Sequence, residues 1–384
     1  MKGLFKKSMS AALVAAMGLS MMACGSSSTQ TTSTTTSSAQ ESTSEASGSA
    51  DASAEEAAPD YGEVDFAIQV QGHSMPIYMA GYEGLFEEAG ITANFELFTD
   101  GSTENEALGS NQWEIGAYGN LAAVAGGIAY GSHIIAASCA DEYSCNAWVR
   151  ADSDIAQTSG ALEGYPNVLG TAEQWKGKTI LCPTGTGGHY ALGKCLELFG
   201  LTFDDVEIIS MDVAKGLTAF SAGQGDILVS WSPVSYQAEE AGFVQAYSSA
   251  DLGLVIPCYI VASEKVIQEE PEKVAAALKA IFEAVDMTYG DVDAQAEIFQ
   301  QLGTEYGNDY TMETCVRTMT EKPIYSLEDN LAFFEGEYGS RPIDEYLYDV
   351  IDFCVEQGIY TEEQKQYLID NNFIDGSFLE MIAE

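Results

Sequence analysis

The sequence predicts an α/β protein with two lobes, each a mainly parallel sheet with flanking helices, and a helical C-terminal part. From residue 64 onward, apolar runs typical of strands alternate with turns rich in Gly, Ser, Thr, Asn or Pro and with amphipathic helices. A stretch marked by Gly and Pro at residues 160–170 separates two sets of these units. With 384 residues, 46% of them hydrophobic, the chain can fill two cores of ordinary size.

The first lobe is predicted from four strand-like runs. Pro76 suits the first turn of the helix after the first run, Gly90 suits its end, and Asn120 can cap the helix after the third run. The runs are VDFAIQV at 64–70, TANFELF at 92–98, EIGAYG at 114–119 and HIIAAS at 133–138.

The second lobe is predicted from three further runs, each followed by a turn and a helix. They are GKTILCP at 177–183, VEIISM at 206–211 and DILVSW at 226–231. The segment NAWVRADSD at 146–154 is expected to cross between the lobes, and the apolar run at 254–263 to return the chain to the first. We therefore predict one lobe from residues 61–150 plus 253–384 and another from 151–252.

The N-terminus predicts export and lipid anchoring. A basic start with Lys2, Lys6 and Lys7 precedes a short apolar run, so residues 1–23 are typical of a signal peptide. Its end, MMAC at 21–24, resembles the lipobox of bacterial lipoproteins and marks Cys24 for lipidation, although a plain signal peptide before a chance cysteine is the alternative. Residues 24–60 are rich in Ser and Thr and form a disordered tether. We expect an extracytoplasmic, lipid-anchored monomer.

Charge and metal-binding residue types exclude several functions. With 59 acidic and 15 basic residues, the net charge of -44 repels nucleic acid. The 3 histidines and 8 cysteines lack the spacing of a metal site, so neither a metal nor a cofactor is expected. Cys139 and Cys145 are the best candidates for a disulfide, and buried free thiols are the other interpretation.

A glycine-rich turn at 183–195, PTGTGGHYALGKC, is one residue type short of a phosphate-binding P-loop. Apolar spacing places Lys194 about a turn inside a helix, and Cys195 cannot replace the magnesium-binding hydroxyl, so an NTPase is excluded. The turn from Thr184 to His189 could bind a ligand through its backbone N–H groups, or could simply cap the helix.

The folded part resembles the extracytoplasmic solute-binding proteins of ABC importers that bind sulfonates, taurine, nitrate and thiamine-precursor pyrimidines. The motifs that carry the resemblance are IYMAGYEGLFEEAGI, GSTENEALGSNQWEIGAYGN, WVRADSD, WKGKTILCPTGTGGHYALGKCLELFGL, AFSAGQGDILVSWSP and IVASEKVIQEEPEKV. It implies the two-lobed periplasmic-binding-protein-like fold of type II, with ligand held in the cleft by loops at the carboxyl ends of strands.

The resemblance implies a set of ligand-binding residues in these loops. Tyr118 and Trp231 could instead only pack, and Ser102 and Ser232 could only cap helices. The set is Ser74, Met75, Gly101, Ser102, Thr103, Tyr118, Asn120, Thr184, Thr186, Gly187, Gly188, His189, Tyr190, Trp231 and Ser232.

The resemblance also implies the function: a membrane-anchored substrate-binding component of an ABC uptake transporter, which captures a small solute and delivers it to a permease. The alternatives are a pyrimidine-synthesis-like enzyme of the same fold, and a non-transport lipoprotein adhesin. The candidate turns hold no Arg or Lys, and Arg150 is expected to face solvent. We therefore predict a ligand that is neutral or has one compact anionic group, with an apolar part against Trp231, Tyr118 or Tyr190.

Overall fold

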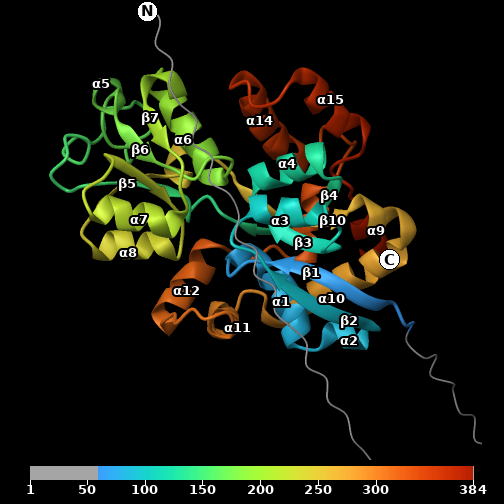
Figure 1. Ribbon diagram of the computed structural model, residues 1–384. Helices are drawn as coiled ribbons and strands as arrows, with labels where there is room; N and C mark the ends of the chain where they lie inside the picture. Colours follow the sequence, from blue (N-terminus) through green and yellow to red (C-terminus); the bar gives the residue numbers. More distant parts are fainter. Residues whose placement is uncertain (1–58, 384) are drawn as a thin grey trace, which may run out of the picture. The chain divides into compact units, whose positions relative to one another are not determined.

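The computed structural model describes residues 59–383, which form two five-stranded sheets with helices around them (Figure 1). The predicted signal peptide, Cys24 and nearly all of the tether lie outside the described residues. Within residues 59–383, no helix has the length and apolar character needed to cross a membrane.

The first sheet has the strand order β2-β1-β3-β10-β4. Strand β1 pairs in parallel with β2 and β3, whereas β10 is antiparallel to both β3 and β4, so four of the five strands run in one direction. The strands are β1 (Gly62–Ile68), β2 (Ile91–Leu97), β3 (Ile115–Tyr118), β4 (Ser132–Ala140) and β10 (Pro257–Ser263).

The second sheet repeats this plan with the order β7-β6-β8-β5-β9. Strand β6 is parallel to β7 and β8, and β5 is antiparallel to β8 and β9. The strands are β5 (Asn146–Val149), β6 (Thr179–Leu181), β7 (Glu207–Ile209), β8 (Ile227–Ser230) and β9 (Val244–Ser248). Both sheets are thus mainly parallel, as predicted. The antiparallel strands are β10 in the first sheet and β5 in the second, and each is the first strand that the chain forms after it crosses from the other sheet.

The boundary expected at residue 150 differs from the structure. Strand β5 pairs with β8 and β9, so residues 146–149 belong to the second sheet, and the first crossing is the segment 141–145. The short apolar run NAWV could extend either sheet, and only its pairing partners decide between them. The second crossing, before β10, lies close to the predicted residue 253.

Helices of the first lobe surround its sheet. Helix α10 packs along α1 and α2, while α3 and α4 lie next to each other near β3 (Figure 1). Pro76 lies in the first turn of α1, as predicted. These helices are α1 (Met75–Tyr82), α2 (Leu85–Glu88), α3 (Gly101–Leu108), α4 (Asn120–Ala129), α9 (Glu264–Glu269) and α10 (Pro271–Thr288).

The chain beyond α10 is helical, as predicted, and packs on the first lobe. Helix α16 contacts α10, and α14 and α15 contact α4. The helices are α11 (Val292–Glu305), α12 (Met312–Glu321), α13 (Leu327–Phe333), α14 (Pro342–Glu356), α15 (Glu362–Asp370) and α16 (Ser377–Ala383).

The second lobe has a smaller set of helices and its own apolar core. Helix α7 packs on β8 and α8 lies beside α7 (Figure 1), while Trp175, Leu192 and Tyr247 are buried in the main cluster of this lobe. The helices are α5 (Ala172–Trp175), α6 (Gly187–Leu198), α7 (Val213–Ser221) and α8 (Val234–Glu240).

Candidate ligand-binding site

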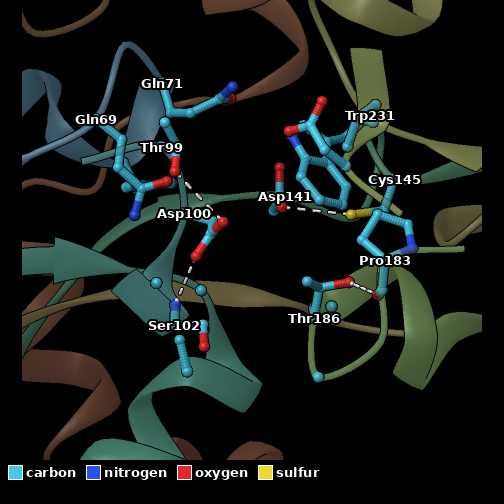
Figure 2. Close-up of a pocket in the computed structure, with 18 of the residues that line it drawn as sticks. Gln69, Gln71, Thr99, Asp100, Ser102, Asp141, Cys145, Pro183, Thr186 and Trp231 are labelled. Carbon is cyan, nitrogen blue, oxygen red and sulfur yellow. Dashed lines mark hydrogen bonds between the residues drawn. The ribbon is translucent and has the colours of Figure 1, made fainter. Parts of the chain in front are cut away.

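A cavity of about 260 Å³ lies where the two lobes face each other. Its lining follows the carboxyl ends of β1, β2, β3, β6, β7 and β8, which is where open parallel sheets bind ligands. Figure 2 shows Trp231 and Pro183 on one side of the cavity, with Gln69, Thr99 and Asp100 on the other. The volume lies just below the range that is typical of small-molecule sites, about 300–1,000 Å³, and suits a small solute.

Asp100 fixes the turn of the first lobe that lines the cavity. Its Oδ1 accepts hydrogen bonds from the backbone N–H groups of Ser102 and Thr103, both at 2.9 Å, which makes it the N-cap of α3. A Cβ at Gly101 would lie 2.4 Å from the Cβ of Ala122, so glycine lets α3 approach α4. The carboxylate of Asp100 therefore occupies the positive end of this helix.

A buried polar network lies behind this wall. Gln69 Nε2 donates to Glu104 Oε2 at 2.7 Å, and the Gln69 backbone N–H donates to Ser74 Oγ at 2.9 Å. Glu104 is fully buried, and burial raises its pKa from 4.5 to about 8. The side chain is therefore protonated at neutral pH, and it holds Gln69 in place without adding a negative charge.

The second lobe forms its wall mainly from backbone. Thr186 Oγ1 donates to the Pro183 carbonyl at 2.7 Å and accepts from the His189 N–H at 3.4 Å, which caps the N-terminus of α6. Gly185 has φ of +76°, a conformation that favours glycine. A Cβ at Gly187 would lie 3.3 Å from Asn120 Oδ1 of the other lobe, so this glycine permits close contact between the lobes.

Helix α6 begins at Gly187, and Lys194 lies inside it, as the sequence predicts. Lys194 pairs with Asp349 at 3.2 Å and with Glu197 at 3.5 Å. Its ammonium is therefore engaged on the helix surface, away from the turn that lines the cavity.

Asp212 has the same role in the second lobe that Asp100 has in the first. It is the N-cap of α7 and accepts from the N–H groups of Ala214 and Lys215 at 3.0 and 3.2 Å. Both aspartates line the cavity, and they follow β2 and β7, which hold equivalent positions at the sheet edges. Carboxylates therefore occupy the N-termini of both α3 and α7.

The structure brings six of the predicted residues to the cavity lining. They come from three separate turns, two in the second lobe and one in the first. The six are Gly101, Ser102, Thr184, Thr186, Gly187 and Trp231.

Several other candidates support the cavity wall from behind. Met75 is fully buried in the core, and Tyr118 is fully buried with its hydroxyl donating to Ser132 Oγ at 2.9 Å. His189 stacks on Phe203 with ring centroids 4.7 Å apart, and Tyr190 Oη donates to Asp349. The candidates outside the described cavity lining are Ser74, Met75, Thr103, Tyr118, Asn120, Gly188, His189, Tyr190 and Ser232.

A charged cluster in the cavity was not predicted from the sequence. Lys322 forms an ion pair with Asp141, and both line the cavity together with His73 and Cys145. Burial by itself lowers the pKa of Lys322, but the neighbouring acidic groups, led by the Asp141 carboxylate, together outweigh this effect and the net pKa is raised. Burial, reinforced by the Lys322 ammonium, lowers the pKa of His73 to about 3, so this imidazole is neutral.

Lys322 reaches the cavity because the chain after α12 pairs with β4. The Ala140 N–H donates to the Pro323 carbonyl at 3.0 Å, and the Tyr325 N–H donates to the Ser138 carbonyl at 3.0 Å. Ile324 thus forms an antiparallel bridge with Cys139. No local sequence pattern marks this pairing, because the two segments lie far apart in the chain.

Two further expectations are settled by side-chain contacts. Cys139 and Cys145 are free thiols, as are the other cysteines of the described residues, and all are buried. Arg150 does not simply face solvent: it donates to the carbonyl of Gly225 at 2.7 Å and lies 4.2 Å from the ring centroid of Phe220. It holds the turn after α7, and the cavity lining does not include it.

The two related sheets, the two crossings and the cavity between them define the fold of the periplasmic solute-binding proteins. Among residues 59–383, no group of three or more His, Cys, Asp or Glu side chains is arranged to hold a metal ion.

Comparisons with known proteins confirm the resemblance that the sequence predicts. Residues 167–294 match the family model described as NMT1/THI5 like. The chain is 28% identical over 302 residues to a protein of Brachyspira hyodysenteriae named as an ABC transporter periplasmic binding protein. The aligned region covers 78% of this chain and 84% of that relative.

Solved structures show the same fold. The periplasmic aliphatic sulphonate binding protein SsuA from Escherichia coli has a TM-score of 0.61 and 15% identity, over 77% of this chain and 88% of that one. The alkanesulfonate-binding protein SsuA from Xanthomonas axonopodis pv. citri, bound to MOPS, has a TM-score of 0.57 and 17% identity, over 69% of this chain and 86% of that one.

Proposed function

We propose that this chain is the substrate-binding component of an ABC uptake transporter, which takes a small solute into the cavity and delivers it to a permease. The observation that carries this proposal is the cavity of about 260 Å³ with walls from both lobes. A solute that contacts both walls binds the closed arrangement preferentially, and so drives the lobes together.

The proposed solute is a small sulfonate-type compound with one anionic group and an apolar part. Two structural neighbours are named for binding sulphonates, and the Trp231 ring offers the apolar part a surface at the cavity. The cavity is too small for a large polyanion. Nitrate, taurine and pyrimidine-like compounds are the other members of the class to be tested.

The proposal includes no catalytic step. Burial, helped by the neighbouring Asp141, raises the pKa of Cys145 well above its ordinary value, so this thiol is not a ready nucleophile. Its Sγ lies 3.4 Å from Asp141 Oδ2, to which it donates. His73, the histidine of the cavity, is kept neutral by burial and by Lys322.

The anchor and the location belong to the same proposal. Cys24 carries the lipid, residues 24–60 form the tether, and the folded part works as a monomer outside the cytoplasm. Fractionation of cells that express Cys24→Ala tests the anchor. We expect the protein to leave the membrane fraction, and unchanged acyl labelling would contradict the assignment.

The binding function is tested in two ways. Native mass spectrometry of the protein from its host weighs any retained solute, and calorimetry tests a panel of alkyl and aryl sulfonates, taurine, nitrate, a hydroxymethylpyrimidine and a phosphate ester. We expect one sulfonate-type compound to bind, and Trp231→Ala to weaken it at least tenfold. Tight binding of the dianionic phosphate ester, unaffected by Trp231→Ala, would contradict this picture of the site.

A further inference from the structure

Lys322 is a buried cation in the wall of the cavity. Its side chain is 1% exposed, and its stem packs on Gly72, where a Cβ would lie 2.6 Å from Lys322 Cδ. Among the described residues that line the cavity, it is the only Lys or Arg. Its charge therefore acts on any solute that occupies the cavity, with little screening by water.

The ammonium of Lys322 has hydrogen-bonding capacity that residues 59–383 do not fill. An ammonium carries three N–H donors, and the partner found for Lys322 is Asp141 Oδ1, which also accepts from Ser144 Oγ. Next to this pair, His73 Nε2 is buried and has no hydrogen-bond partner within the described part of the chain, and the residue is only 7% exposed. Buried polar groups are normally satisfied, so these donor and acceptor atoms at the cavity are suited to hydrogen-bond a bound solute.

A purely structural ion pair would look different, and this chain provides an example. Lys273 is also nearly buried, but its Nζ has three partners: Glu270, Glu114 at 3.8 Å and the carbonyl of Glu63 at 3.3 Å. Described residues thus place two close oxygen partners and a third acidic group around that ammonium, which lies outside the cavity lining. Lys322, by contrast, has one such partner among residues 59–383, Asp141, and it lies on the cavity.

Other sites for an anionic group are partly closed. The N-termini of α3 and α7 are occupied by the carboxylates of Asp100 and Asp212, so they repel a second anion. The N-terminus of α6 also reaches the cavity, but the neutral Thr186 hydroxyl caps it and it carries only a partial charge. Among the described residues that line the cavity, Lys322 therefore provides the full positive charge for an oxyanion.

We propose that Lys322 binds the anionic oxygens of the solute directly and is a specificity-determining residue, with Asp141 as the positioning residue that holds the ammonium toward the cavity. This inference rests on the proposed solute-binding function and adds the group that selects charge. It also gives the helical C-terminal part a role in binding, because Lys322 directly follows α12.

The test compares charged and uncharged solutes of the same shape. Calorimetry on the full chain uses ethanesulfonate with its uncharged isostere ethyl methyl sulfone, and each further sulfonate of the panel with its methyl sulfone. We expect the wild type to prefer the sulfonate at least tenfold and Lys322→Met to remove this preference. Lys273→Met is the matched control, and it should keep the preference because that buried lysine does not reach the cavity.

Asp141 is left without its partner in Lys322→Met, so the double variant Asp141→Asn/Lys322→Met serves where the single variant fails to fold. It should also bind sulfonate and sulfone equally, while Lys322→Arg should retain the preference. A sulfonate preference that survives in a folded variant without Lys322 overturns the inference but leaves the solute-binding function intact. If the wild type binds only the uncharged sulfones, the inference about Lys322 is likewise overturned and the solute-binding function again stands. If the wild type binds no member of the panel, both proposals are overturned.

Discussion

The two lobes share one strand order but build their cavity walls in different ways. The first lobe lines the cavity with buried side chains, including Gln69, His73 and Lys322. The second lobe contributes mostly turn backbone, in the segments 183–187 and 210–213, together with the Trp231 ring. The first wall therefore combines side chains fixed by packing with the turn 99–102, whereas the second consists mainly of local turns that glycine and threonine shape.

This difference between the walls predicts which lobe determines the choice of solute and which lobe closes over it. Charged and amide side chains that are held by a core can select a solute, because moving them costs the energy of the surrounding packing. Backbone turns on a separate core can instead close over different solutes. Substitutions in the first lobe should therefore change which solute binds. Substitutions in the second lobe should mainly change how tightly that lobe closes over the solute.

The largest effect is expected from Phe220→Ala in the second lobe. Phe220 is fully buried, its ring lies 4.8 Å from that of Phe243, and Arg150 packs on it. Removing it should lower the free energy of unfolding by about 3–5 kcal/mol, measured by urea denaturation. Ile209→Ala, at a position 38% exposed, is the control and should cost far less. If folded Phe220→Ala protein loses its preference among solutes, the division of roles between the lobes is wrong.

A somewhat smaller effect is expected from Asn330→Ala in the first lobe. Asn330 Oδ1 accepts from the Ala137 N–H at 2.7 Å, and its Nδ2 donates to the carbonyls of Ala137 and Ser326, both at 3.0 Å. The substitution leaves buried backbone groups of β4 unpaired, so we expect a loss of about 2–3 kcal/mol. Because this contact helps to hold the segment after Lys322, sulfonate affinity should also fall. Asn371→Ala, at the exposed position directly after α15, is the control, and an equal loss there would contradict this assignment.

A pH-dependent effect is expected at Glu104. Its pKa is about 8 in the folded protein against an ordinary value of 4.5, so between these values the folded state holds one more proton. The stability that the protonated side chain contributes is full below about pH 4.5 and is lost as the pH rises through about 8. The urea midpoint of Glu104→Gln should therefore rise relative to the urea midpoint of the wild type as the pH increases from 6 to 9. The exposed Glu106→Gln should show no such trend, and a constant gap for Glu104→Gln would argue against a protonated Glu104.

The smallest effect is expected from Arg317→Ala, which removes a contact between the lobes. Arg317 Nη1 donates to Glu239 at 2.6 Å and its guanidinium lies 4.0 Å from the ring centroid of Tyr236, both in α8 of the second lobe. The side chain is 43% exposed, so we expect a loss of only about 0.5–1 kcal/mol. Solute affinity should fall roughly twofold to fivefold. Calorimetry measures the affinity, and solution scattering with solute would show whether the lobes still come together.

Local sequence patterns predicted part of the second lobe's wall, whereas the segment 210–213 of that wall was not in the predicted set. The turn after β6 is encoded by the three consecutive residues Thr184, Gly185 and Thr186, and Trp231 directly follows β8. A strand, a glycine-rich turn and a helix place these residues at a carboxyl edge whatever the rest of the chain does. The same reasoning correctly predicted the mainly parallel sheets and the position of Lys194 inside α6.

Candidates such as Tyr118 and His189 show the limit of that reasoning. A residue at the end of a strand or the start of a helix can face the cavity or the core, and the periodicity of the sequence leaves a one-residue uncertainty that reverses the direction. Tyr118 faces the core and His189 faces Phe203. Only the packing of neighbouring elements decides between these directions.

The α/β architecture, the two lobes, the turns at the carboxyl edges and the helical C-terminal part could all be predicted from the sequence. They follow from local periodicity, caps and glycine positions. The tertiary structure alone decided that β5 belongs to the second sheet and that Lys322 meets Asp141 in the cavity. Those two residues are separated by 181 positions, and their meeting depends on the pairing of the chain after α12 with β4. A contact of this kind is set by the free energy of the whole folded chain, and no local pattern of residues encodes it.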